Sequence, residues 1–187
     1  LSIKKVIAFG SQAEYGPSNS IRHEDSELNP TTLYGKLKIE CCKLFMKSVV
    51  KGTDFIWLRL FDTYGPDDNP NWLLPYLINS AIKDFSPKLT KCDQIWDFLF
   101  IDDLCECIYK ILLFEGRVFD IYNLCSGDRV VLKNIVEFIF SEINPKKAKP
   151  LYGSIPYRED QIFRLEGSNK KICEKFMWSP KTDIYNG

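Results

Sequence analysis

Three side chains near the start of the sequence could together move a proton to or from an oxygen atom: those of Ser11, Tyr34 and Lys38. Tyr34 and Lys38 are four residues apart, so on a helix they share one face. A positive charge about 4 Å from a phenolic oxygen favours the phenolate form by up to ~4 kcal/mol at an effective dielectric constant of ~20. Because a proton donor works best when its acidity matches the working pH, the pair predicts acid–base chemistry near neutral pH.

The elements that must position these residues follow from an alternation of short apolar runs with longer amphipathic stretches. This alternation predicts an α/β fold with a parallel sheet, and less regular segments predict a second, smaller lobe. The expected strands are 4–9, 54–60, 95–101 and 118–124, and the expected helices are 31–50, 72–83, 104–114, 132–143 and 168–176. Ser11 then follows the first strand, at the edge where open α/β sheets bind ligands.

The regularity of this alternation divides the sequence into two parts. Residues 1–60 and 93–144 carry the regular strand–helix units and are expected to form one domain. Residues 61–92 and 145–187 are richer in turn residues and less regular, so we assign them to the smaller lobe.

The composition is that of a globular protein and argues against several partners. The 187 residues include 25 basic and 25 acidic side chains, so the formal net charge is zero. This balance gives no basic surface for nucleic acid or an anionic membrane, and no apolar run reaches the roughly 20 residues of a membrane span. Without a visible signal peptide, we expect a cytoplasmic protein. The seven cysteines lack the C-x-x-C spacing of a zinc site, so we expect reduced thiols and no metal.

Five segments occur in the order found in one enzyme family. They are G-S-Q-A-E-Y-G at 10–16, Y-x-x-x-K at 34–38, R-L-F-D-T-Y-G-P at 59–66, W-D-F-L-F-I-D-D at 96–103 and W-S-P at 178–180. Together they resemble the extended short-chain dehydrogenase/reductases that act on nucleotide sugars, the NAD-dependent epimerase/dehydratase family. The resemblance implies a partial doubly wound (Rossmann-like) parallel sheet with a small C-terminal substrate-binding lobe. It makes residues 1–60 and 93–144 the C-terminal part of the Rossmann-like domain, and residues 61–92 and 145–187 the lobe that binds the nucleotide sugar. A Y-x-x-x-K pair alone is a weak signal, whereas five segments in the family's order are a strong one.

The resemblance implies a role for each of the first three residues. Tyr34 is the acid or base on the sugar oxygen, Lys38 tunes that tyrosine and holds the nicotinamide ribose, and Ser11 forms a hydrogen bond with the reacting oxygen. The implied cofactor is NAD or NADP, which carries out the hydride chemistry while the protein supplies proton transfer and orientation. Phe61 and Thr63 are expected to contact this cofactor, beside Tyr34 and Lys38.

The same resemblance makes a nucleotide-diphosphate sugar the substrate and places the nucleotide against the smaller lobe. Arg158 is the candidate pyrophosphate ligand, because a guanidinium can meet two phosphate oxygens, and a surface arginine is the alternative. Trp96 stands where many relatives have arginine, so it either stacks on a base or packs. Glu14 is either a substrate contact or a solvated loop carboxylate. Ser11 and Tyr64 complete the expected substrate contacts.

The two positions after the serine narrow the reaction. Sugar dehydratases of the family carry acidic groups there, whereas this chain has Gln12 and Ala13. Dehydration is therefore disfavoured, and the pattern looks most like the 4-keto-6-deoxy-sugar reductases. Two alternatives stay open: a nucleotide-sugar epimerase, which uses the same catalytic residues, and a catalytically inactive, truncated binding module.

The family's opening strand, glycine-rich turn and helix, which receive the cofactor pyrophosphate, have no counterpart in the sequence. We therefore expect this chain alone to bind NAD(P) poorly. We also expect an unpaired sheet edge, which favours association. A homodimer through the helix of Tyr34 is a further expectation of the resemblance.

Overall fold

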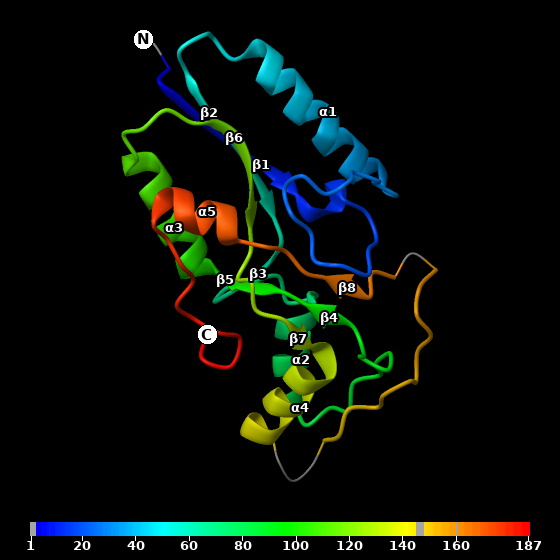
Figure 1. Ribbon diagram of the computed structural model, residues 1–187. Helices are drawn as coiled ribbons and strands as arrows, with labels where there is room; N and C mark the ends of the chain where they lie inside the picture. Colours follow the sequence, from blue (N-terminus) through cyan, green and yellow to red (C-terminus); the bar gives the residue numbers. More distant parts are fainter. Residues whose placement is uncertain (1–2, 145–147, 160) are drawn as a thin grey trace.

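A computed structural model describes residues 3–144, 148–159 and 161–187 (Figure 1). The first residues of the 145–187 segment, up to position 147, and Asp160 lie outside the described residues. Figure 1 shows one sheet in the upper part of the view with helices on both sides of it, and the helices Leu73–Ile82 and Leu132–Ile143 below it.

The central sheet has three parallel strands in the order β1-β2-β6: β1 (Lys5–Ser11), β2 (Asp54–Leu60) and β6 (Phe119–Leu124). Ser11 is aligned with Leu60, and Leu60 with Leu124, so the carboxyl ends of the three strands lie at one edge. β2 is buried along almost its whole length, because it has a strand on each side and helices over both faces. The expected parallel sheet is confirmed.

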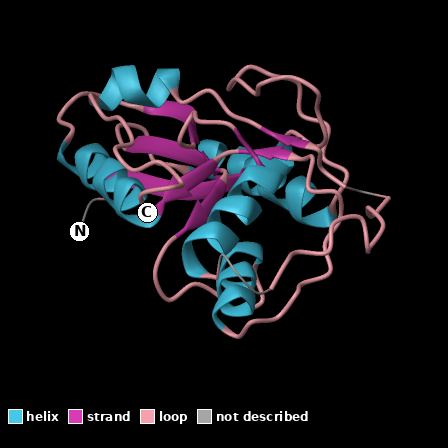
Figure 2. Cartoon of the chain, turned by 90° about the horizontal axis from the view of Figure 1, so that it is seen from below, coloured by secondary structure: helices cyan, strands magenta, loops and turns pink. Residues whose placement is uncertain are grey.

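Helices cover the two faces of this sheet. α1 (Leu33–Ser48) covers one face, and α3 (Ile101–Leu113) and α5 (Lys170–Phe176) cover the other (Figures 1 and 2). The alternation of side chains along β2 accounts for this arrangement. Phe55 and Trp57 pack with Cys42 of α1, whereas Ile56 and Leu58 pack in the core formed with α3 and α5.

A second apolar core lies between α2 (Leu73–Ile82) and α4 (Leu132–Ile143), which pack against each other. Two small sheets complete the fold. One is the parallel pair β3 (Asp62–Tyr64) and β5 (Phe98–Phe100); the other has the order β7 (Val130–Val131), β4 (Ile95–Trp96), β8 (Arg164–Leu165). The sequence did not predict β3, β7 or β8.

The single strand expected over 95–101 is wrong. The segment is divided at Asp97 into β4 and β5, which belong to different sheets, and α3 begins directly afterwards at Ile101. The buried Asp97 carboxylate accepts hydrogen bonds from the backbone N–H groups of Ser126 (2.7 Å) and Gly127 (2.8 Å). These bonds hold the chain at the point where it passes from one sheet to the other.

Hydrophobic packing groups two helices differently from the division expected along the sequence. α4 was assigned to the Rossmann-like part, but it packs with α2 in the second core. α5 was assigned to the smaller lobe, but Ile172 and Phe176 on it are buried against the central sheet and α3. The amphipathic pattern of each helix predicts that one of its faces is buried. It does not predict which other element covers that face. The division by residue range stays a prediction.

Disulfides, membrane-spanning helices and clusters of metal ligands are absent from the part of the chain that the structure describes. All seven cysteines are free, and four of them are buried: Cys42, Cys92, Cys107 and Cys125. Across the described ranges, no helix is both long enough and apolar enough to cross a membrane. Within the same residues, no group of three or more His, Cys, Asp or Glu side chains is arranged to hold a metal ion.

Candidate active site

Ser11, the last residue of β1, is oriented by the turn that follows it. Residues Gln12–Glu14 form a short 3₁₀ helix, and Ser11 caps it. The Ser11 Oγ accepts a hydrogen bond from the Ala13 N–H (3.1 Å), while the Ser11 N–H donates to Glu14 Oε1 (2.9 Å). Since the hydroxyl oxygen already has a donor, its own hydrogen is left to donate to a ligand.

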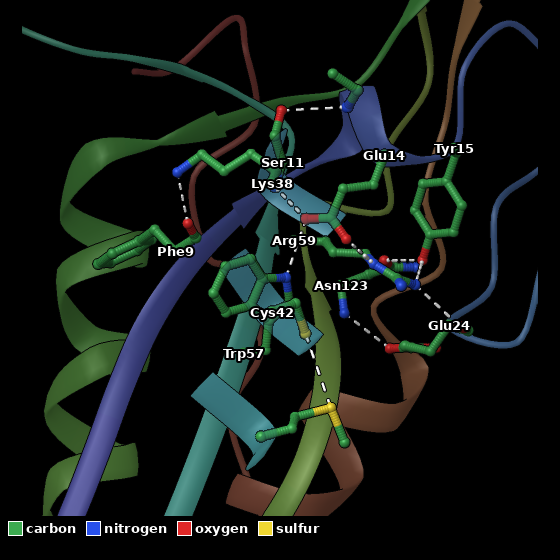
Figure 3. A network of polar contacts seen from close by, with 12 residues as sticks. Phe9, Ser11, Glu14, Tyr15, Glu24, Lys38, Cys42, Trp57, Arg59 and Asn123 are labelled. Carbon is green, nitrogen blue, oxygen red and sulfur yellow. Dashed lines mark hydrogen bonds and ion pairs between the residues drawn. The ribbon is translucent and has the colours of Figure 1, made fainter. Parts of the chain in front are cut away.

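Glu14 is a buried anchor for this turn (Figure 3). Its side chain is 1% exposed, and besides the Ser11 N–H it accepts from Trp57 Nε1 (3.0 Å) and Arg59 Nε (2.8 Å). Gly10 makes room for these contacts, because a Cβ there would lie 2.2 Å from Trp57 Nε1 and 2.3 Å from Glu14 Oε1. The end of β1 is therefore tied to β2 through one carboxylate.

Arg59 extends this network to the third strand. It donates to the Tyr15 hydroxyl (2.8 Å), and that hydroxyl donates to Asn123 Oδ1 on β6 (2.6 Å). Burial by itself lowers the pKa of Arg59, but the contacts with Tyr15 and Glu14 outweigh burial and leave this pKa raised. Burial raises the pKa of Tyr15 to about 12. A charged guanidinium and a neutral phenol thus join the carboxyl ends of all three strands.

A close approach at Gly35 brings α1 against the same turn. Thr32 caps the helix by accepting from the Gly35 N–H (3.1 Å). A Cβ on Gly35 would lie 2.3 Å from the Ala13 carbonyl oxygen, so a larger residue would push the helix away. Tyr34 is the neighbour of this glycine and is thereby held beside the end of β1.

Tyr34 and Lys38 lie on the same side of α1. The Lys38 Nζ is 5.6 Å from the centre of the Tyr34 ring and donates to the Phe9 carbonyl oxygen on β1 (2.7 Å; Figure 3). Tyr34 is 54% exposed, so its hydroxyl is accessible to a ligand. The electrostatic effect of the lysine on the phenol stays a prediction.

A cavity of about 620 Å³ opens at the ends of β1 and β2. Six of the residues predicted from the sequence line it: Ser11, Tyr34, Phe61, Thr63, Trp96 and Arg158. They come from α1, the ends of the central strands, β3, β4 and the C-terminal loop. A ligand in this cavity can contact Ser11 and Tyr34 at the same time.

Three other predicted residues do not line this cavity. Lys38 stands beside Tyr34 and bonds to β1, as described above. Two expected substrate contacts are corrected. Glu14 has three donors of its own and is neither solvated nor open to the cavity, so it positions Ser11 instead. Tyr64 lines a separate cavity of about 430 Å³, and its hydroxyl donates to the Asp183 carbonyl oxygen (2.9 Å).

Six polar or aromatic residues of the cavity wall were not predicted as site residues: Gln12, Asp62, Asp68, Asn71, Trp72 and Phe98. Asp62 lies between Phe61 and Thr63, which were both predicted, and strand neighbours normally face opposite sides, so the alternation hid it. Asn71 and Trp72 belong to an irregular loop without any periodic signal. The Asp-rich composition of that loop was the sole hint.

Two carboxyl groups at this end of the molecule have raised pKa values. Burial, and secondly the charge of Asp97, raises the pKa of Asp62 to about 6. Burial also raises the pKa of Asp97 to about 6, although hydrogen bonds from Ser126 and Gly127 act in the opposite direction. The charge beside the cavity therefore changes over a mildly acidic pH range.

We expect Asp62→Asn to raise the free energy of unfolding by about 1–3 kcal/mol near pH 7.5, because the variant no longer buries a charged carboxylate. The folded-state pKa of about 6 lies above the ordinary value of 3.8. The stabilising contribution of Asp62 is therefore complete below that ordinary value and is lost as the pH rises through about 6. Urea unfolding should show the advantage of the variant near pH 7.5 and little advantage near pH 4.

Asp67→Asn is the matched control for this measurement, because Asp67 is an exposed residue in the turn that follows β3. It should change the unfolding free energy by less than about 0.5 kcal/mol at both pH values. An Asp62→Asn advantage that is equally large at both pH values would contradict the assignment of the raised pKa.

The sequence of this chain is similar to a known protein family and to individual proteins of known activity. The profile described as "NAD dependent epimerase/dehydratase family" matches residues 1–125. The chain is 30% identical over 137 residues to CDP-abequose synthase of Salmonella typhimurium, covering 71% of this chain and 46% of that protein. It is 28% identical over 149 residues to dTDP-4-dehydro-6-deoxyglucose reductase of Escherichia coli, covering 76% and 46%. The chain spans about half the length of the curated relatives it matches.

Solved structures share the fold. MoeE5 in complex with UDP-glucuronic acid and NAD has a TM-score of 0.87 at 18% identity, covering 98% of this chain and 62% of that chain. UDP-glucuronic acid 4-epimerase from Bacillus cereus, in complex with UDP-glucuronic acid and NAD, has a TM-score of 0.86 at 21% identity, with 100% and 60% covered. At these identities the likeness concerns the fold, and it confirms the Rossmann-like α/β architecture.

Proposed function

This chain belongs to the NAD-dependent epimerase/dehydratase family, and from that premise we propose that it forms the acid–base part of a nucleotide-sugar oxidoreductase. The proposed reaction is the NAD(P)H-dependent reduction of a 4-keto-6-deoxy sugar. The observation that carries the proposal is the position of Ser11 and Tyr34 on the wall of one cavity. The names of the two relatives, an abequose synthase and a deoxysugar reductase, support the same chemistry.

Proton transfer is the step that the residues of this chain perform. The keto oxygen that becomes a hydroxyl needs a proton, and Tyr34 Oη donates it. Ser11 Oγ accepts from the Ala13 N–H, so its hydrogen is available to the same keto oxygen. Two donors then face the negative charge that develops on that oxygen, which lowers the barrier to reduction.

The residues fit one end of a nicotinamide dinucleotide. The Tyr34 hydroxyl and the Lys38 ammonium are donors suited to ribose hydroxyls, and Phe61 and Thr63 line the adjoining cavity. When bound, the dinucleotide supplies the hydride. The 187 residues hold no glycine-rich turn for the pyrophosphate, so we propose that a dinucleotide-binding segment outside these residues completes the site. Among the described strands β1 pairs with β2 alone, and its free edge can accept a further strand.

The nucleotide diphosphate is proposed to bind at the other wall of the cavity. Arg158 lines this wall and offers the planar donor fork that suits phosphate oxygens. Trp96 lines it as well, and its Nε1–H donates to the Ile162 carbonyl oxygen (3.2 Å). With the N–H bonded and Phe98 6.0 Å away on one side, the indole ring is held in place for stacking on a base.

The positions after Ser11 support reduction over water elimination. Gln12 lines the cavity and Ala13 has no polar side chain, so neither supplies a carboxyl group for dehydration. The chain is nevertheless 29% identical over 137 residues to dTDP-glucose 4,6-dehydratase of Escherichia coli, covering 67% of this chain and 36% of that protein. Overall similarity to a dehydratase therefore does not carry dehydratase chemistry with it here.

Assembly and location belong to the same proposal. We propose a cytoplasmic protein without nucleic-acid or membrane partners, for which the zero net charge is the support. We also propose a homodimer through α1, on which Leu33, Leu37 and Leu44 are 72%, 55% and 65% exposed. Spacings of four and seven residues place these leucines on one stripe of the helix.

Cofactor consumption tests the proposed reaction. The chain, joined to a glycine-rich dinucleotide-binding half and given a nucleotide 4-keto-6-deoxy sugar, should oxidise NAD(P)H in equimolar amounts with the sugar reduced. Absorbance of NAD(P)H and NMR of the sugar measure the two quantities together. An epimerase would change the stereochemistry of the sugar without net loss of NAD(P)H, and an inactive binding module would bind the sugar and change neither quantity.

A further inference from the structure

The cavity has a negative wall that the proposed reaction does not use. Asp62, the first residue of β3, lines the cavity between Phe61 and Thr63, and Asp68 lines it nearby. Arg158 is the cationic residue among those that line the cavity, and it lies in the C-terminal loop. A ligand here therefore meets opposite charges from two different parts of the chain.

Asp62 belongs to the part of the cavity next to Ser11. In the register of the central sheet Ser11 is aligned with Leu60, and β3 begins two residues after Leu60. The sugar oxygen that receives the proton from Tyr34 has to lie near Ser11 and Tyr34. The sugar therefore occupies the end of the cavity next to Ser11. The diphosphate is drawn to Arg158 and repelled by a carboxylate, which leaves Asp62 to face the sugar.

The Asp62 carboxylate has bonding capacity to offer a ligand. Within the described residues, no hydrogen bond or ion pair involves its carboxylate oxygens. A carboxylate is an acceptor with two oxygens, and a buried one that lacks donors is costly to keep charged. Hydroxyl groups of a sugar are donors that match it.

We propose that Asp62 determines the class of sugar: it accepts hydrogen bonds from the hydroxyls of an uncharged sugar and rejects a sugar that carries a carboxylate. This inference rests on the proposed function, since it requires a nucleotide sugar in the cavity. Two carboxylates a few ångströms apart repel each other, and the repulsion is stronger where water is partly excluded. Hydroxyl donors experience no such repulsion.

UDP-glucose and UDP-glucuronic acid form a matched pair of probes, because they differ in one group of the sugar, a hydroxymethyl against a carboxylate. Calorimetric titration of the 187-residue chain with each probe near pH 7.5 should show UDP-glucose binding at least tenfold more tightly. Asp62→Asn should reduce this ratio by roughly tenfold, the effect of removing one nearby like charge. The ratio cancels any effect of the substitution on the diphosphate, which both probes share.

A change of pH supplies a second measurement on the unmodified chain. Asp97, between β4 and β5, is the charged group that acts on Asp62, and the other charged or titratable groups described on the wall of the same cavity are Asp68, Arg158 and Tyr34. The pKa of Asp62 is about 6, whereas the sugar carboxylate stays ionised in mild acid. The binding ratio of the wild-type chain should therefore narrow near pH 5, and that of Asp62→Asn should change much less.

Asp67→Asn is the control, because it removes one exposed acidic charge from the turn after β3 and Asp67 does not line the cavity. It should leave the ratio as in the wild-type chain. An Asp62→Asn ratio equal to that of the wild type would overturn the proposed role of Asp62 and leave the proposed function standing. If neither probe bound at concentrations up to about 1 mM, the proposed binding of a nucleotide sugar in this cavity would be contradicted, and the inference with it.

Discussion

Replacing Arg59 by alanine should lower the free energy of unfolding by about 3–5 kcal/mol, because it leaves a buried carboxylate without its opposite charge. Glu14 is 1% exposed and Arg59 3% exposed, and their ion pair is 2.8 Å long. Arg59 also bonds to the Tyr15 hydroxyl and to the Glu24 carbonyl oxygen (2.9 Å). A loss of this size is a large share of the 5–15 kcal/mol that stabilises a typical domain. Urea unfolding near pH 7.5 measures it.

Two matched variants separate the charge from the packing. Arg59→Ala combined with Glu14→Gln should recover part of the loss, because the second change removes the unpaired charge and keeps an acceptor for Trp57. Lys43→Gln breaks an exposed ion pair between Lys43 and Glu40, whose side chains are 59% and 68% exposed. It should lower the free energy of unfolding by less than about 1 kcal/mol. A loss below about 1 kcal/mol for Arg59→Ala would show that the buried pair does not hold the strand ends together.

The longer elements of the fold were predictable because their signals are local. β2 and α4 have the bounds expected from sequence, and α1 is shorter than expected by two residues at each end. A run of apolar residues or a helical repeat marks such elements without reference to the rest of the chain. β3, β7 and β8 have two or three residues each and exist because they pair with distant strands. Pairing between distant segments leaves no periodic signal in so short a run.

The residues of the candidate site were likewise predictable only where their signal is local. The spacing of Tyr34 and Lys38 is a property of one helix, and the sequence was enough to select both residues. Glu14 was expected in contact with substrate or solvent, and its true surroundings depend on Arg59, 45 residues away. Asp62 was passed over because its exposure to the cavity depends on how β3 leaves the central sheet. Residues whose role depends on a distant partner are those that sequence reasoning misplaced.

Tyr34→Phe should lower the rate of sugar reduction by about 10²–10⁴-fold, because the phenol is the proposed proton donor to the keto oxygen. The phenyl ring keeps the shape of the cavity wall, so the KM for the nucleotide sugar should stay within a few-fold of the wild type. The measurement uses the chain joined to a dinucleotide-binding half. Tyr109→Phe is the matched control: Tyr109 is 60% exposed on α3, outside the cavity, and its loss of a hydroxyl should leave kcat unchanged.

The proposal that Tyr34 is the proton donor of a sugar reductase is tested most directly by single-turnover kinetics. NAD(P)H oxidation is followed after the enzyme is mixed with a saturating nucleotide 4-keto-6-deoxy sugar, so that binding and product release do not enter the rate. A fall of at least about 100-fold in Tyr34→Phe, with Tyr109→Phe at the wild-type rate, is the predicted result. A Tyr34→Phe enzyme that turns over at the wild-type rate would contradict it.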